Sequence, residues 1–126
     1  MKKLTFSMEN YLEAIYELSS ANEGVRLTDI AEKMGVTKAS ANNAMTVLME
    51  KGMVTKEKYQ DVYLTSYGKK VAESTSKKHH MLQRFLSTVL KVDKKIADTD
   101  ACAIEHVISD VSVAAMADFL ANYKAK

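Results

Sequence analysis

Apolar side chains recur at helical spacing from the first residues of the chain. One helix is expected over residues 7–21, with Ser7 as its cap and an apolar face made of Met8, Tyr11, Leu12, Ile15 and Leu18. Such a face needs a partner, so the helix is expected to pack into a core.

Two further helices are expected close together. Thr28 can cap a short helix that Gly35 ends. Thr37 can then cap a third helix, which runs to Lys51 and stops at Gly52. Two short helices joined by a tight turn that contains glycine are typical of a helix-turn-helix.

The pattern changes after this helix-turn-helix. Residues 53–58 alternate loosely and residues 62–64 are Val-Tyr-Leu, which predicts a β-hairpin. Thr65 is expected to cap a long fourth helix that runs to about Leu90. A fifth helix is expected over residues 93–109, and Asp110 is expected to cap a sixth. The expected fold is mainly α with a small hairpin wing.

Two domains are expected. Residues 1–72 form a winged helix-turn-helix DNA-binding domain, and residues 73–126 a helical dimerisation domain, with the helix 65–90 shared between them. The last two helices carry more apolar side chains than a short chain can cover alone, so a twofold homodimer is expected. These side chains are Ile104, Val107, Ile108, Val113, Met116 and Leu120.

Composition narrows the class of protein. The chain has 126 residues, of which 47% are hydrophobic, so one compact domain or two small ones can form. No stretch reaches the apolar length of a membrane span or a signal peptide, and the single cysteine excludes an intramolecular disulfide. We therefore expect a cytoplasmic protein with no membrane partner.

The third helix and the wing carry the candidate DNA-contact surface. Short polar side chains at the start of a recognition helix suit base edges and phosphates. The net charge is only +2, so charge alone does not identify a DNA-binding protein, and a surface for protein contacts is the alternative. Because wing lysines follow this helix, we favour DNA. The predicted contacts are Thr37, Lys38, Ala39, Ser40, Asn42, Asn43, Lys56 and Lys58.

The fifth helix contains a cluster of metal-ligating residue types. Cys102, Glu105 and His106 are spaced i, i+3 and i+4, on one helical face, and Asp98 lies one turn earlier on that face. Thiolate, carboxylate and imidazole groups together bind transition metals. The alternative is a buried cysteine beside a surface Glu-His pair.

Two adjacent histidines in the fourth helix have different helical neighbours. His80 has polar neighbours and is expected to be solvated. His79 lies at the edge of an apolar stripe, where it needs either a metal or a hydrogen-bond partner in the core. The neighbours of His79 include Ala72, Leu82, Leu86 and Leu90.

The sequence resembles the metal-dependent repressors of the diphtheria toxin repressor and manganese transport regulator family (DtxR/MntR). The resemblance extends from Ser7 to about Leu120. It is carried by residues 8–18, 29–32, 64–68 and, most specifically, 102–110.

The resemblance implies a metal site that joins the first helix to the fourth and fifth. Its ligands would be Asn10, Glu13, His79, Asp98, Cys102, Glu105 and His106. Cys102 matches the iron-type branch of the family, whereas Glu13 and His79 match the manganese-type branch. The resemblance therefore implies Fe²⁺ or Mn²⁺, with Co²⁺, Ni²⁺ and Zn²⁺ also compatible, and a short form without the SH3-like domain of larger members.

The expected function is a metal-dependent repressor of metal-homeostasis genes that binds double-stranded operator DNA. One alternative is a winged-helix regulator that has lost metal dependence, because Asn10 stands where the family often has Met or Asp. Another is a small metalloenzyme, but the chain has no HExxH motif and no glycine-rich phosphate loop. We therefore expect no enzyme and no small organic substrate. The native metal, the number of metals per subunit and the operator remain open.

Overall fold

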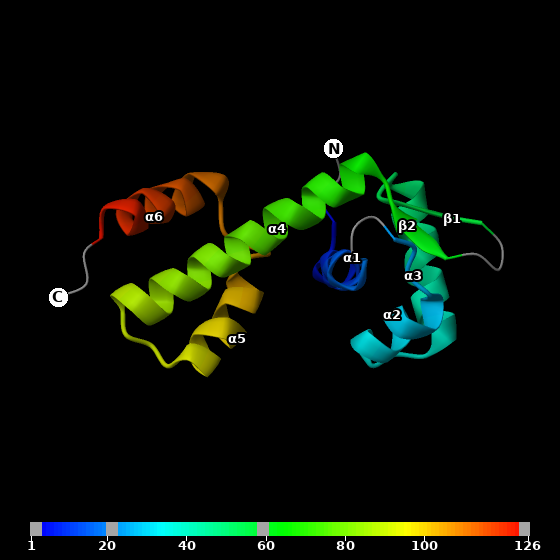
Figure 1. Cartoon of the computed structure of the whole chain (residues 1–126), viewed down its shortest axis with the longest axis horizontal. Coiled ribbons are helices and arrows are strands. Elements are labelled where there is room, and N and C mark those ends of the chain that lie inside the picture. The colour runs from blue at the N-terminus through cyan, green and yellow to red at the C-terminus, as the bar shows by residue number, and fades with distance from the viewer. Residues whose placement is uncertain (1–3, 20–22, 58–60, 124–126) are drawn as a thin grey trace. The chain divides into compact units, whose positions relative to one another are not determined.

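The computed structural model describes residues 4–19, 23–57 and 61–123. The predicted fold class is confirmed: the chain is mainly helical with one two-stranded antiparallel hairpin (Figure 1). Two compact units divide it, Met1–Glu73 and Ser74–Lys126. The elements in order are α1 (Phe6–Leu18), α2 (Leu27–Met34), α3 (Lys38–Glu50), β1 (Val54–Lys56), β2 (Val62–Leu64), α4 (Ser66–Arg84), the π-helical η2 (Phe85–Val89), α5 (Lys94–Ile104) and α6 (Asp110–Asn122).

The first unit is a winged helix. Helices α1, α2 and α3 pack on one another, and α3 also packs on β1. In the hairpin, Thr55 lies opposite Tyr63, and Val62 also bridges to Val25 before α2. The apolar faces predicted from helical spacing meet in one core. Its fully buried members include Leu12, Ile15, Ile30, Met45, Leu48 and Val62.

Three predicted caps are wrong. Helix α1 begins one residue before Ser7, because the Thr5 hydroxyl already accepts the Met8 N–H. Helix α6 is capped by the Ser109 hydroxyl, which accepts the Ser112 N–H, and not by Asp110. In both cases the hydroxyl belongs to an earlier residue with extended backbone, the conformation that an N-cap requires.

Helix α2 lacks a side-chain cap altogether. Its N-cap is Arg26 and not the predicted Thr28. The Arg26 guanidinium pairs instead with Asp29 in the first turn, at 3.5 Å between Nε and Oδ2. At its other end Gly35 has a φ of 68°, the left-handed conformation predicted for a glycine at this position.

The last helices differ in length from the prediction. The helix expected over 65–90 is α-helical only to Arg84, and η2 continues it with π-helical geometry. Helix α5 ends at Ile104, although the pattern predicted a helix to residue 109. Residues 105–107 form a turn before α6, so His106 does not lie on the helix.

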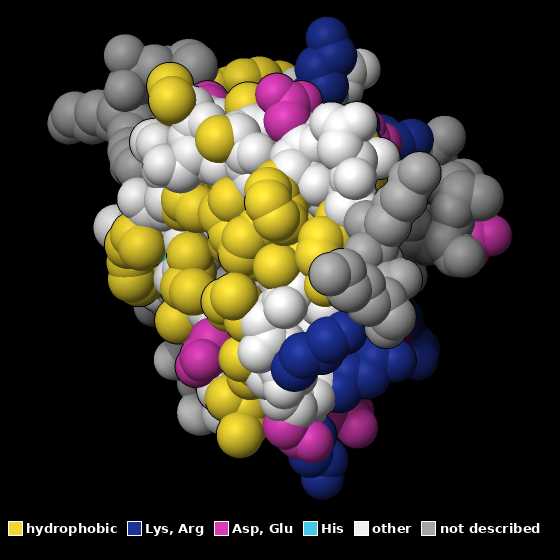
Figure 2. Space-filling view, turned by 90° about the vertical axis from the view of Figure 1, so that its left-hand side faces the viewer, with side chains coloured by type: hydrophobic (Ala, Val, Ile, Leu, Met, Phe, Trp, Pro, Cys, Tyr) yellow, Lys and Arg dark blue, Asp and Glu magenta, His cyan; other side chains and the backbone are white. Residues whose placement is uncertain are grey.

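The second unit has a smaller core and a more apolar surface. Helices α5 and α6 both pack on η2, with Leu82, Ala97 and Ala101 fully buried. Figure 2 shows hydrophobic side chains gathered on the end of this unit. The exposed large apolar residues of the unit are Leu90, Ile96, Val107, Val111 and Phe119. In the described part of the chain no helix has the length and hydropathy of a membrane span.

Candidate metal centre and DNA-contact surface

Helix α3 presents a polar face to solvent. The Thr37 hydroxyl accepts the Ser40 N–H at 3.1 Å and donates to Ser40 Oγ at 3.0 Å, so it fixes the start of the helix. The other predicted contacts of this helix are all exposed: Lys38, Ala39, Ser40, Asn42 and Asn43. The opposite face is buried and consists of Ala41, Ala44, Met45 and Leu48. The core therefore holds α3 with its polar side outward, which suits insertion into a DNA groove.

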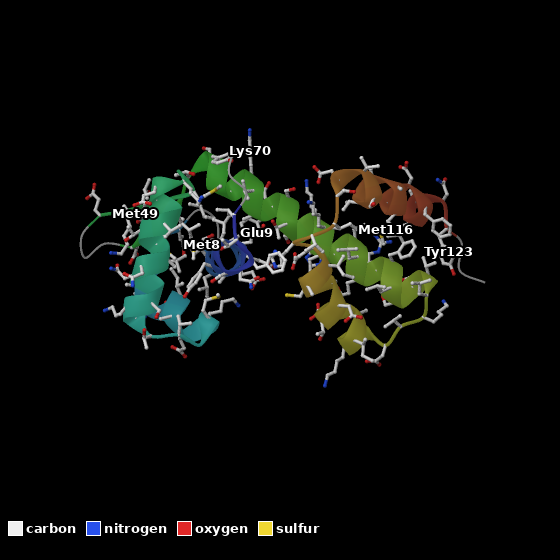
Figure 3. All side chains as sticks on the ribbon, turned by 180° about the vertical axis from the view of Figure 1, so that it is seen from behind. Met8, Glu9, Met49, Lys70, Met116 and Tyr123 are labelled. Carbon is white, nitrogen blue, oxygen red and sulfur yellow. The ribbon has the colours of Figure 1, made fainter. Side chains whose placement is uncertain are left out.

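The structure adds two residues to this surface. Thr46 is exposed one turn after Asn42, whose carbonyl accepts its hydroxyl at 3.2 Å. Met49 follows with 41% of its surface exposed (Figure 3). The helical spacing from Asn42 to Thr46 is the signal that could have found Thr46 from the sequence.

The wing is described only in part. Lys56 ends β1, is partly exposed and lies opposite Val62. Lys58, the other predicted wing contact, lies outside the described residues. Tyr63 on β2, which the sequence reasoning did not select, is 46% exposed.

The candidate metal centre begins with His79 on α4. Its Nε2 hydrogen-bonds to Asp98 Oδ1 on α5 at 2.8 Å. Its Nδ1 lies 3.5 Å from Oε1 of Glu105, the residue that caps α5. Two carboxylates, one within α5 and one at its C-terminal cap, thus flank one imidazole, each at a different ring nitrogen.

Burial distinguishes these three side chains. The Glu105 side chain is 0% exposed and the His79 side chain 16%, whereas the Asp98 side chain is 58% exposed. His80, in contrast, is exposed, as its polar neighbours predicted. The His79–Glu105 contact is therefore the one shielded from solvent, whereas the His79–Asp98 contact lies nearer the surface.

The remaining predicted ligands of α5 are not equivalent to one another. His106 is buried, but it lies in the turn after α5, so the argument of a shared helical face does not extend to it. Cys102 is exposed. On α1, Asn10 and Glu13 are both partly buried.

The donor chemistry of the cluster fits a divalent metal. His79 Nδ1 is buried and has no hydrogen bond in the described part of the chain, and it faces a fully buried carboxylate. Imidazole nitrogen and carboxylate oxygen are ligands that Mn²⁺, Fe²⁺ and Zn²⁺ share. Among the described residues, however, no three His, Cys, Asp or Glu side chains are already gathered around one point. One reason is visible: Asp98 and Glu105 approach opposite nitrogens of His79.

Comparison with known families accounts for nearly the whole chain. Residues 3–62 match the N-terminal DNA binding domain of the iron dependent repressors, and residues 65–126 match their metal binding and dimerisation domain.

Individual relatives agree with this match. An uncharacterized HTH-type transcriptional regulator of Methanocaldococcus jannaschii is 31% identical over 95% of this chain and 97% of its own length. The HTH-type transcriptional regulator MntR of Bacillus subtilis is 32% identical over 95% of this chain and 84% of its own. Among solved structures, the manganese regulator SloR superposes with a TM-score of 0.78 at 32% identity, over 98% of this chain and 56% of SloR.

Proposed function

The chain belongs to the iron dependent repressor family and is a metal-dependent, DNA-binding transcriptional regulator; from this premise we propose that its homodimer represses metal-homeostasis genes when Fe²⁺ or Mn²⁺ binds. Members of this family regulate transcription and are not enzymes. A regulator of this kind acts where the chromosome is, so we place it in the cytoplasm.

The observation that carries the metal site is the contact between His79 and Glu105. We assign His79 Nδ1 and the Glu105 carboxylate as ligands, because they face each other at 3.5 Å in a buried position. Asp98 then has a different role from the one its spacing suggested. Its hydrogen bond to Nε2 orients the ring and fixes the tautomer that leaves Nδ1 free to bind a cation.

The other ligands in the proposal come from the family resemblance and the sequence. Asn10, Glu13, Cys102 and His106 complete the set, with Asn10 offering its amide oxygen. They are supported by their residue types. His106 is supported in addition because it is buried and directly follows Glu105 in the chain. A set that combines one thiolate with carboxylates and imidazoles suits Fe²⁺, and the carboxylates also suit Mn²⁺. The similarity to SloR, which is described as a manganese regulator, favours Mn²⁺.

A bound metal would supply positive charge and a link between residues on different elements. Ligands drawn from several elements favour the arrangement that holds them all. If that arrangement spaces the two α3 helices of a dimer for successive major grooves, metal affinity and DNA affinity become coupled.

The second candidate is a winged-helix regulator without metal dependence. Asn10 favours it, because an amide oxygen is a weaker ligand than a carboxylate. One experiment separates the candidates: selection of DNA from a random pool, with chelator or with Mn²⁺, Fe²⁺ or Zn²⁺. We expect enrichment of a palindromic site only with metal, and Glu105→Gln, which keeps the shape of the side chain but removes its charge, should abolish this enrichment. Equal enrichment with chelator would support the second candidate.

A further inference from the structure

We propose that Thr65 and Gly68 form a clamp that fixes the end of the recognition helix α3 to the start of α4, and that this clamp transmits the metal signal to the DNA-contact surface. The signal itself rests on the proposed function. The two residues would be positioning residues, since neither belongs to the proposed metal site or DNA-contact surface.

Thr65 joins two segments of the chain through its backbone N–H and its hydroxyl group. Its N–H donates to the Met53 carbonyl at 3.0 Å. Its hydroxyl donates to the Gly52 carbonyl at 2.6 Å, with the Met53 carbonyl also within 3.1 Å. The same hydroxyl accepts the Gly68 N–H at 2.9 Å, as the cap of the first turn of α4. One side chain therefore caps α4 and holds it to the segment that follows α3.

Gly68 allows α4 to come this close. A Cβ atom at this position would lie 1.9 Å from the Met53 carbonyl oxygen and 2.8 Å from its carbon. These are backbone atoms that cannot turn aside, so any other residue would force the two segments apart. The glycine is thus required by close approach and not by its φ angle.

The segment held by the clamp is itself tied to α3. Met53 N–H donates to the Leu48 carbonyl at 2.9 Å, and Gly52, with a φ of 73°, closes the helix in the left-handed conformation. Leu48 is fully buried in the core face of α3. Immediately beyond, Val54 pairs with Leu64 at the base of the wing. Recognition helix, wing base and α4 start are consequently one hydrogen-bonded body.

Helix α4 connects this body to the metal centre. It runs without a break from Ser66 to Arg84 and carries His79. Helix α4 is the segment of chain that joins the two units, so a change in α4 on metal binding would reach α3 by way of its first turn. With the clamp intact, α3 has to follow; without it, the first turn can move while α3 stays.

The test compares Thr65→Val, which keeps the shape but removes the hydroxyl, with Thr65→Ser, which keeps the hydroxyl. The full-length protein is used, and DNA affinity is measured with chelator and with saturating Mn²⁺, alongside metal affinity in the absence of DNA. We expect Thr65→Val to reduce the metal-induced gain in DNA affinity about tenfold, within the usual range of coupling between sites. Its metal affinity and its affinity with chelator should stay near wild type, and Thr65→Ser should retain the gain. Thr99→Val is the matched control, since it removes a hydroxyl bond to the Lys95 carbonyl at 3.0 Å on α5.

The outcomes are distinguishable. A loss of DNA affinity that is equal with and without metal, or no loss at all, would overturn the transmitting role of the clamp. A wild-type protein with no metal response would overturn the proposed function and the transmitting role with it.

Hydrogen exchange on the wild-type protein tests the clamp even if Thr65→Val does not fold. The Thr65 and Gly68 amides should exchange as slowly as the core amides of α3, with chelator and with metal alike. Exchange at the rate of exposed loop amides would mean that the joint opens freely, and would also overturn the proposal.

Discussion

At the scale of single residues, two adjacent histidines show how position on a helix decides chemical use. His79 is enclosed between two carboxylates, whereas His80 stands one residue later and is exposed. The two rings contact each other edge to face, with centroids 5.7 Å apart. The two residues are the same type and adjacent in the chain, but in the described part of the chain only His79 contacts carboxylates, so they form a matched pair for mutation.

We predict that His79→Ala weakens metal binding more than about a hundredfold, while His80→Ala changes it little. Removing a ligand should cost more than the tenfold to hundredfold that loss of a supporting hydrogen bond typically costs. Calorimetric titration of both variants with Mn²⁺ measures this. Equal losses, or none in either, would mean that the wrong face of α4 has been assigned to the metal.

Asp98 gives a finer test of the same site. If it orients His79 through Nε2, Asp98→Ala should cost about tenfold to hundredfold in metal affinity, which is less than His79→Ala. The same titration decides between roles. A loss as large as that of His79→Ala would make Asp98 a ligand, as its spacing from Cys102 first suggested.

At the scale of elements, α3 and the wing are expected to contact different parts of the DNA, because their exposed side chains differ in chemistry. The α3 amides can read base edges, whereas a wing lysine can only neutralise phosphate. We predict that Asn43→Ala alters sequence preference, and that Lys56→Ala weakens binding to all sequences and lowers the salt slope by about one unit. Fluorescence anisotropy on the selected site and on single-base variants, over a range of salt, measures both. An Asn43→Ala protein with unchanged affinity and preference would remove that residue from the recognition surface.

The start of α6 depends on one hydroxyl. Ser109 Oγ accepts the Ser112 N–H at 3.2 Å, so Ser109→Ala should lower the free energy of unfolding by about 1 kcal/mol. Ser112→Ala is the control, because it leaves this backbone bond in place and should cost much less. Urea unfolding of the two variants measures the difference, and equal costs would show that the cap contributes nothing.

The elements also show how far sequence reasoning reaches. Apolar spacing, caps and glycine stops together located α1 to α6, and Thr37 was placed correctly as the cap of α3. Boundaries failed where several residues can serve: Thr5 and Ser7, or Ser109 and Asp110, differ only in local backbone, which packing decides. The predicted end of α5 was also too late. Glu105 and His106 continue the helical spacing of the sequence, although the backbone turns after Ile104.

The site shows the same limit. Spacing and residue type made Glu105 a candidate ligand and the family resemblance added His79, but neither predicted that the two side chains face each other in a buried position. That contact joins residues on α4 and α5 that are 26 positions apart in the chain. Thr65 was predicted correctly as the cap of α4, but its bond to the Gly52 carbonyl and the close approach of Gly68 to Met53 could not be predicted, because both depend on how the segments pack.

At the scale of the whole molecule, the second unit leaves a large apolar surface uncovered. Val107 and Val111 are 63% and 81% exposed. Contiguous apolar surface of this kind marks an interface, and the matched domain is described as a dimerisation domain. We predict a dimer at micromolar concentration by light scattering, and Val107→Glu should shift the equilibrium toward monomer. Thr99→Glu, which introduces the same charge at an exposed polar position, should not. A monomeric wild-type protein would contradict the dimer.

We predict that a divalent metal controls DNA binding through Glu105. The measurement is the affinity of the wild-type and Glu105→Gln proteins for the selected DNA site, each with chelator and with saturating Mn²⁺ or Fe²⁺. Coupling between sites is typically about fivefold to 150-fold, so wild-type affinity should rise by at least about fivefold with one of these metals. Glu105→Gln should remain a folded dimer with the chelator-level affinity throughout. A wild-type affinity that is the same with and without metal, or a Glu105→Gln protein with the full metal response, would contradict the account.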